Sequence, residues 1–307
     1  MPSRFPSDRP YGRALRKRLD ILVAGAGLLA MLASIATLLI LLAGLAMDGG
    51  PHLSWKFFTS YPSRFPDAAG ILPAWVGTML VMVVTAVTAV PLGIAAAVYL
   101  EEYAPRHWVT DLIEINMANL AGVPSIIYGL MALGLLVYQL HLGQSILTAG
   151  LTLALLILPI VVMATREALR TVPQSIREAA GALGATKWQT VWDHVLPAAT
   201  GGILTGLILA LSRAIGESAP LMTIGALSFI AFLPHEPWQT DFPFVSFEWL
   251  LDPFTVMPIQ MFNWVSRPQE AFHRIAAAAG LLLMVMTLAM NGLAIYIRAR
   301  YRKHIQW

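Results

Sequence analysis

Long runs without a charged residue alternate with short polar segments along this chain. The runs at 21–47, 71–100 and 275–297 are each long enough to cross a bilayer, which takes roughly 20 helical residues. The stretch 115–165 also carries no charge, and its polar centre at 139–144 divides it into two predicted spans, at 121–140 and 146–165. Because hydrocarbon leaves backbone groups no water to bind, each run is expected to be helical.

A further run begins after Pro197 and continues past Arg213 and Glu217 towards Ile230, which brings the predicted number of transmembrane helices to six. The composition agrees, since 57% of the residues are hydrophobic and only 12% are charged, too apolar a balance for an ordinary soluble domain. The chain has no cysteine, so disulfides and cysteine-ligated metals are excluded. The sequence therefore predicts an all-α integral membrane protein.

The distribution of positive charge predicts how the chain is oriented in the membrane. Most Lys and Arg residues fall on the side that carries both termini, whereas Lys56, Arg64 and Arg267 fall on the other side. Cytoplasmic loops carry the excess of positive charge, so both termini are expected in the cytoplasm. The predicted segments are a basic cytoplasmic N-terminus at 1–20, an N-terminal transmembrane helix at 21–47, a periplasmic loop at 48–70, a transmembrane core at 71–297 and a basic cytoplasmic C-terminus at 298–307. The core contains a cytoplasmic loop at 166–197 and an aromatic periplasmic loop at 231–271.

The cytoplasmic loop contains signals for two short helices. Ser175 and Glu178 have the spacing of a capping box, and Gly184 can end the first helix by adopting the left-handed conformation. Thr186 and Gln189 form a second capping box, which predicts a second, separate short helix. Helices this short are marginal in isolation, so both are expected to dock on another surface.

Arg213 and Glu217 stand one helical turn apart within an apolar run and can pair on one face. A charge in the hydrocarbon region costs at least about 2.5–3.5 kcal/mol on insertion scales, so such residues usually face a cavity, a pathway or a partner. The guanidinium fork suits a tetrahedral oxyanion, Glu217 would partly neutralise it, and Ser212 and Ser218 would add hydroxyls to the same path. The alternative is that the span ends near Ile215, which would place the pair at the membrane boundary.

Two sets of motifs resemble a known family. Glu178-Ala179-Ala180, followed by Gly184 and by Leu196-Pro197, resembles the EAA signature of ABC-importer permeases, although His194 stands where that signature has isoleucine. The segments 212–221, 253–260 and 263–270 are similar to those of phosphate-specific permeases of the PstA type.

The resemblance implies a type I ABC importer permease fold in the bacterial inner membrane. It implies that the cytoplasmic loop forms a coupling helix for an ATPase and that Arg213 and Glu217 take part in phosphate passage. The partners that it implies are a PstC-type permease, a PstB-type ATPase dimer and a periplasmic PstS-type phosphate-binding protein. The expected coupling residues are Glu178, Ala179, Ala180, Leu183 and Gly184.

Other kinds of chemistry find little support in the sequence. The G-K-[ST] end of a phosphate loop is missing after Gly184, so ATP and Mg are expected in the partner ATPase and no cofactor in this chain. No catalytic or metal-binding motif is present, nucleic-acid binding has no support beyond charge, and the basic N-terminus can contact anionic lipid. The alternatives that remain are an ABC permease for another oxyanion, such as molybdate or sulfate, and an ion-coupled secondary transporter, which would not need an ATPase-docking loop.

Overall fold

The computed structural model describes residues 10–105, 107–236 and 246–302. Within these ranges the chain is helical and forms no β-strand, apart from an isolated bridge between Ser145 and Pro253. Parts of several predicted segments lie outside the described residues, namely the first nine residues of the basic N-terminus, Arg106, the aromatic residues Trp238, Phe242 and Phe244, and the last five residues.

Five helices are long and apolar enough to cross a membrane, and a bent pair of helices makes a sixth if it counts as one span. The all-α membrane class is therefore confirmed, with five to six spans among the described residues. The five are α1 (Pro10–Gly49), α3 (Leu72–Val98), α6 (Ile146–Arg170), α9 (Leu196–Ile215) and α12 (Glu270–Arg302). The bent pair is α4 (Trp108–Ala121) with α5 (Ser125–Ala132), which continues as the π-helix η4 (Leu133–Gln139). The shorter elements are η1 (Gly50–His52), α2 (Trp55–Thr59), η2 (Pro66–Ala68), the π-helix η3 (Tyr99–Tyr103), α7 (Gln174–Ala182), α8 (Lys187–Gln189), the π-helix η5 (Thr190–Val195), α10 (Ala219–Thr223), η6 (Glu248–Leu251) and α11 (Met257–Val265).

The third span differs from its prediction. A span was expected at 121–140, but α4 begins at Trp108 and the chain bends by 103° before α5. Pro124 explains the break, because proline disfavours helical backbone at the preceding residue and lacks an N–H. The earlier start escaped prediction because Asp111 and Glu114 interrupt the charge-free pattern.

The second helix of the cytoplasmic loop is not a separate element. The chain stays helical from Lys187 through η5 and α9 to Ile215, past Pro197. Proline normally interrupts a helix because it cannot donate to the carbonyl four residues earlier and its ring meets that carbonyl. The wider π turn immediately before Pro197 accommodates the ring, so the helix continues.

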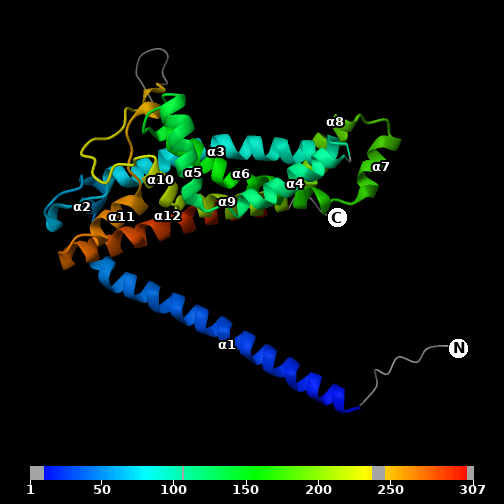
Figure 1. The fold of residues 1–307 in the computed structure, drawn as a ribbon, viewed down its shortest axis with the longest axis horizontal. Coiled ribbons are helices and arrows are strands. Elements are labelled where there is room, and N and C mark those ends of the chain that lie inside the picture. The colour runs from blue at the N-terminus through cyan, green and yellow to red at the C-terminus, as the bar shows by residue number, and fades with distance from the viewer. Residues whose placement is uncertain (1–9, 106, 237–245, 303–307) are drawn as a thin grey trace.

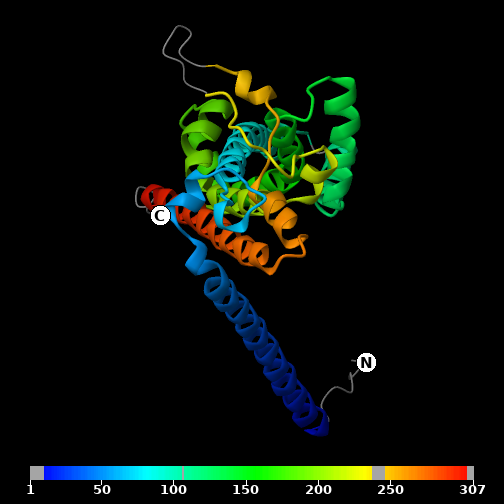
Figure 2. The same ribbon diagram turned by 90° about the vertical axis from the view of Figure 1, so that its left-hand side faces the viewer.

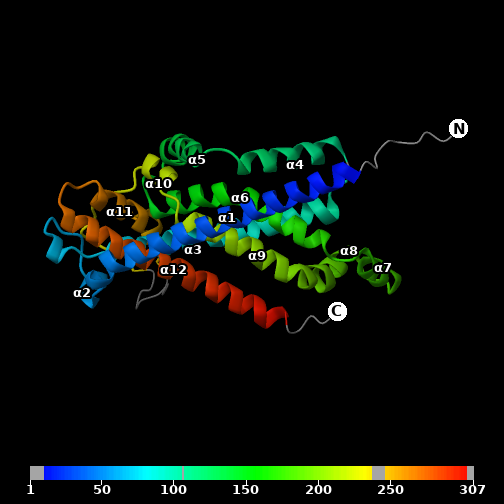
Figure 3. The ribbon, with the colours of Figure 1, turned by 90° about the horizontal axis from the view of Figure 1, so that it is seen from below.

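Small residues allow the long helices to approach closely. Helix α6 packs against both α3 and α9, and all three run along the long axis of the molecule (Figure 3). At the α3–α6 contact Gly150 meets Val84 and Gly93 meets Val161. At the α6–α9 contact Gly202 and Gly206 form a G-x-x-x-G pair against Ala168 and Ala164. Such pairs are typical of membrane helix packing, where dispersion rather than water exclusion drives association.

The molecule has two distinct ends along its long axis. One end, here called the α11 end, carries α2 and α11, and the opposite α7 end carries α7 and α8 (Figure 1). Helix α1 leaves the bundle at a steep angle and contacts it mainly near Gly49, whose backbone touches Ala277 and Ala278 of α12 (Figures 1 and 2). The start of α1 and the end of α12 both point towards the α7 end.

Candidate functional site

Arg213 and Glu217 come together at the end of α9 that is nearer to the α11 end. Arg213 lies in the last turn of α9, the helix ends at Ile215, and Glu217 follows Gly216. The Nε atom of Arg213 lies 3.4 Å from Oε1 of Glu217. The expectation that the helix continues past Glu217 is therefore wrong, and the alternative end near Ile215 is the one observed. Glycine weakens a helix, and Pro220 favours the first turn of the next helix, α10.

The chain after Glu217 turns back onto the bundle. Leu221 and Ile224 are buried, and Gly129 of α5 contacts both Thr223 and Pro220 of α10. Glu217 is 19% exposed and lines a small cavity with Thr78 and Met82 of α3. The apolar stretch that follows the charged pair is thus a packed element rather than an exposed loop.

The Arg213 side chain stays accessible, with 41% of its surface exposed. Its contact with Glu217 uses Nε, so within the described part of the chain the two terminal amino groups keep their donors for another anion. Tyr128 of α5 belongs to the same buried cluster as Ala210 and Ala214, the residues of α9 on either side of Arg213. A half-exposed arginine held by one carboxylate can meet a small anion and still release it.

Ser212 and Ser218, which were predicted to add hydroxyls to the path, make different contacts. The Ser212 hydroxyl contacts the Ile208 carbonyl and the Asn291 side-chain oxygen of α12, each at 2.6 Å. Ser212 therefore ties α9 to α12. Ser218 precedes α10 but makes no capping bond. Asn291 was missed, although a polar amide inside an apolar run is a signal for an interhelical hydrogen bond.

The first capping box predicted in the loop at 166–197 does not form. Helix α7 begins at Gln174, directly after Pro173, and no side chain caps its start. Ser175 therefore lies inside the first turn and not at the capping position, so the Ser175–Glu178 prediction is wrong. The observed N-cap residue is Pro173, so the helix begins two residues earlier than a Ser175 cap would place it.

The two other signals in this loop are confirmed. Gly184 has a φ of +84°, and the N–H groups of Gly184 and Ala185 donate to the carbonyls of Gly181 and Ala180, both at 3.0 Å, which is a Schellman motif. Thr186 and Gln189 form the second capping box. The turn between α7 and α8 is therefore set by local sequence.

The predicted coupling residues divide between a surface and the core. Glu178, Ala179 and Gly184 are exposed, Leu183 is 89% exposed, and Ala180 is buried. The exposed Trp188 and Trp192 stack nearby, with ring centroids 5.5 Å apart. We call the exposed residues Glu178, Ala179, Leu183 and Gly184 the docking surface, since exposed apolar side chains such as Leu183 and the two tryptophans are typical of interaction sites.

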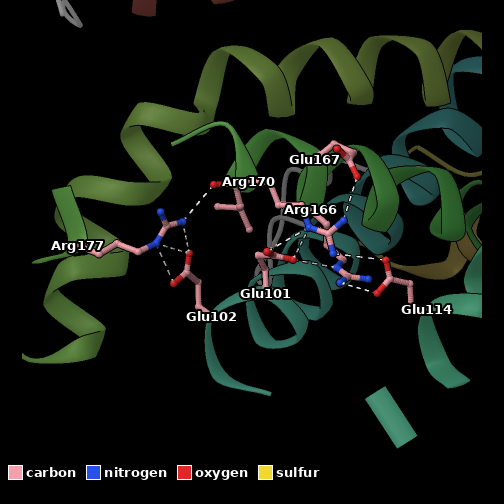
Figure 4. Close-up of polar contacts among 8 residues, drawn as sticks. Glu101, Glu102, Glu114, Arg166, Glu167, Arg170 and Arg177 are labelled. Carbon is pink, nitrogen blue, oxygen red and sulfur yellow. Dashed lines mark hydrogen bonds and ion pairs between the residues drawn. The ribbon is translucent and has the colours of Figure 1, made fainter. Parts of the chain in front are cut away.

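A network of ion pairs lies beneath this surface and was not predicted. It joins acidic residues at the end of α3 and on α4 to arginines at the end of α6 and on α7 (Figure 4). The complementary charges at the ends of two neighbouring spans were a usable signal. No group of metal-binding side chains occurs among the described residues.

Comparison with known proteins places this chain among membrane transport components. The family described as "Binding-protein-dependent transport system inner membrane component" matches residues 89–303. The phosphate transport system permease protein PstA of Yersinia pestis is 31% identical over 95% of this chain and 94% of its own length. The PstA of Mycobacterium leprae is 36% identical over 75% and 70%, and the probable ABC transporter permease YqgI of Bacillus subtilis is 30% identical over 91% and 94%.

Solved structures share the fold at low sequence identity. A chain of a bacterial alginate ABC transporter superposes with a TM-score of 0.62 at 13% identity, covering 95% of this chain and 98% of that one. A chain of the MetNI methionine ABC transporter gives a TM-score of 0.56 at 16% identity, covering 73% and 94%. The structural likeness and the sequence match agree, and this chain belongs to the family of binding-protein-dependent transport system inner membrane components.

Proposed function

We propose that this chain is the permease subunit of an ATP-driven importer of inorganic phosphate. The observation that carries the proposal is the likeness to PstA proteins over most of the chain, at 31% identity over 95% of its length for the Yersinia pestis protein. The exposed guanidinium of Arg213, held by Glu217, supplies a chemically suitable contact for the anion. The chain carries no bond-breaking chemistry of its own.

Arg213 would meet phosphate near the end of α9, where two free amino groups can donate to its oxygens. Glu217 would keep the guanidinium oriented and lower the net positive charge, so that the anion does not remain bound. Ser218 lies close to the pair in sequence, whereas Ser212 contributes mainly to the α9–α12 contact. The path would be completed by a PstC-type permease.

The docking surface on and after α7 would couple this path to ATP hydrolysis. Glu178, Ala179, Leu183 and Gly184 would enter a groove of a PstB-type ATPase dimer, while Ala180 holds α7 to the bundle. ATP and Mg would bind in that partner and not in this chain. The α7 end and both termini would lie in the cytoplasm, and the α11 end would receive a periplasmic PstS-type phosphate-binding protein.

Phosphate uptake by proteoliposomes that contain the full assembly tests the proposal. The wild-type assembly should import phosphate when ATP is supplied inside. Arg213→Gln should abolish uptake without loss of assembly. Arg274→Gln is the matched control, because Arg274 forms the same i,i+4 pair with Glu270 on an exposed part of α12, 3.3 Å apart.

Three outcomes would count against the proposal. Normal uptake by the Arg213→Gln assembly would remove Arg213 from the path. Uptake of sulfate or molybdate without phosphate would identify another oxyanion as the substrate. Uptake by this chain alone, driven by an ion gradient, would show a secondary transporter.

A further inference from the structure

Two adjacent glutamates on η3 point into different parts of the ion-pair network. Glu101 contacts Arg166 and Arg170 of α6, whereas Glu102 contacts Arg177 of α7 (Figure 4). Helix η3 continues α3 as a single π turn, closed by a bond from the Ala104 N–H to the Tyr99 carbonyl. Such π turns inside helices frequently occur at functional sites. The turn therefore connects α3 to the loop that carries the docking surface.

Arg177 joins three elements through one side chain. Its Nη2 and Nε atoms donate to Glu102 of η3 at 2.7 and 3.2 Å. Its Nη1 and Nη2 atoms also donate to the carbonyls of Val172 and Leu169, at 2.8 and 3.1 Å, at the end of α6. The side chains of Arg177 and Glu102 are only 18% and 8% exposed. A planar guanidinium with all these donors engaged leaves α7 little freedom to move separately from η3.

The other side of the same loop contacts the same turn. The Lys187 ammonium, at the start of α8, lies 5.1 Å from the ring centroid of Tyr103. Arg166, with a side chain only 5% exposed, binds Glu101 at 3.3 Å and Glu114 of α4 at 3.0 Å. Arg177 before the docking surface and Lys187 after it thus both contact η3, and so does Arg166 of α6, which also binds α4.

Helix α3 extends from η3 to the neighbourhood of Arg213 and Glu217. At its far end Thr78, Val81 and Met82 line the same small cavity as Glu217. A displacement of η3 therefore has a path to the candidate anion site along α3, which remains helical from Leu72 to Val98 although it contains Pro91.

We propose that η3 is the joint through which movement of α7 reaches α3, and that Arg177 and Glu102 are the positioning residues that keep this joint closed. This inference rests on the proposed function, because it assumes that α7 is moved by an ATPase. It assigns a role to two residues outside the docking surface and outside the candidate anion site.

Distance measurements between spin labels test the joint directly. The chain has no cysteine, so single cysteines at the exposed Gln174 of α7 and at the exposed Leu92 of α3 would give specific labelling of this subunit in a full assembly whose other subunits are made free of cysteine. The wild-type distance should stay the same between the nucleotide-free state and a state trapped with a non-hydrolysable ATP analogue. In the Arg177→Gln assembly it should change with nucleotide. A wild-type distance that changes, or a variant distance that stays fixed, would overturn the proposal.

Transport measurements provide the second readout. Arg177→Gln and Glu102→Gln should each retain ATP hydrolysis and lose phosphate import, so that the amount imported per ATP falls. Glu167→Gln is the control, since Glu167 is an exposed member of the network, paired with Arg170 at 3.3 Å. Normal import per ATP by either variant would refute a positioning role.

The double variant Glu102→Gln/Arg177→Gln separates positioning from folding. It removes both charges together, so no unpaired buried charge remains to prevent assembly. It should assemble as the wild type does and still fail to couple, whereas restored import would show that the pair serves folding only. If the wild-type assembly imports no phosphate, the proposed function fails, but the label distances still decide whether α7 and α3 move together.

Discussion

Replacing Gly184 by alanine should destabilise the end of α7, whereas replacing Gly181 by alanine should stabilise it. Gly184 ends α7 with a φ of +84°, and Gly181 lies within the last turn of the same helix. A Cβ atom at either position would meet nothing within 4 Å. Any difference between the two variants therefore comes from the backbone conformation and not from a steric clash.

The expected magnitudes follow from that conformation. An L-residue held in the left-handed region costs roughly 1–2 kcal/mol, so Gly184→Ala should favour opening of α7 by about 5- to 30-fold. Alanine in place of a helical glycine gains up to about 1 kcal/mol, so Gly181→Ala should reduce opening by up to about fivefold. Helix α7 has only nine residues, so it can open without unfolding the bundle.

Hydrogen–deuterium exchange of the segment 174–185, followed by mass spectrometry in lipid nanodiscs, measures this opening. Exchange should be faster than wild type in Gly184→Ala and slower in Gly181→Ala. Co-purification of the ATPase should decline only in the first variant. Equal exchange rates in the two variants would refute the claim that the left-handed turn at Gly184 holds α7 in place.

Two further predictions concern the bundle and its α11 end. Gly206→Leu should destabilise the α6–α9 contact by roughly 1–3 kcal/mol and lower the Tm, because a side chain at this position meets Ala164. Gly201→Leu is the control and should have little effect, since open space surrounds Gly201. Equal Tm values for the two variants would contradict this prediction. The hydrogen bond and the charge of Asp252, with a smaller contribution from Glu248, raise the pKa of His235. Because the folded-state pKa is the higher one, the stabilising contact between His235 and Asp252 is complete below the ordinary histidine pKa of about 6.5 and is lost as the pH rises through the folded-state value. Hydrogen–deuterium exchange of residues 230–236 should therefore accelerate with rising pH by more than the intrinsic exchange rate does. The Asp252→Asn variant should lack this additional acceleration. The same pH profile in the wild type and the variant would contradict a stabilising contact between His235 and Asp252.

Local signals were read correctly where they involve only a few neighbouring residues. Gly184 and Thr186 form their motifs because a left-handed glycine and a capping hydroxyl satisfy backbone groups within one turn. The signal at Ser175 was also local, but Pro173 takes the N-cap position and α7 begins two residues earlier than predicted. Whether Pro173 or Ser175 becomes the N-cap depends on the path of the chain after the end of α6, which the local sequence does not specify.

The candidate site was predicted in part. Arg213 and Glu217 were expected to pair because they are four residues apart, and they do so at 3.4 Å although the helix ends between them. Their neighbours Tyr128 and Thr78 come from α5 and α3, far away in the sequence. The same holds for the pairing of Glu102 with Arg177, which are 75 positions apart.

The sequence by itself determined the class of the protein and the position of most spans, because hydrocarbon tolerates only long apolar helices and charged residues mark their ends. It also determined the resemblance that identified the family. The bend before α5 and the end of α9 also have local causes, in Pro124 and Gly216. Only the tertiary structure decided which serine faces α12 and which glutamates bind the arginines beneath α7. These features depend on contacts between residues that are distant in the chain, and the free energy of such contacts exists only after the helices have packed.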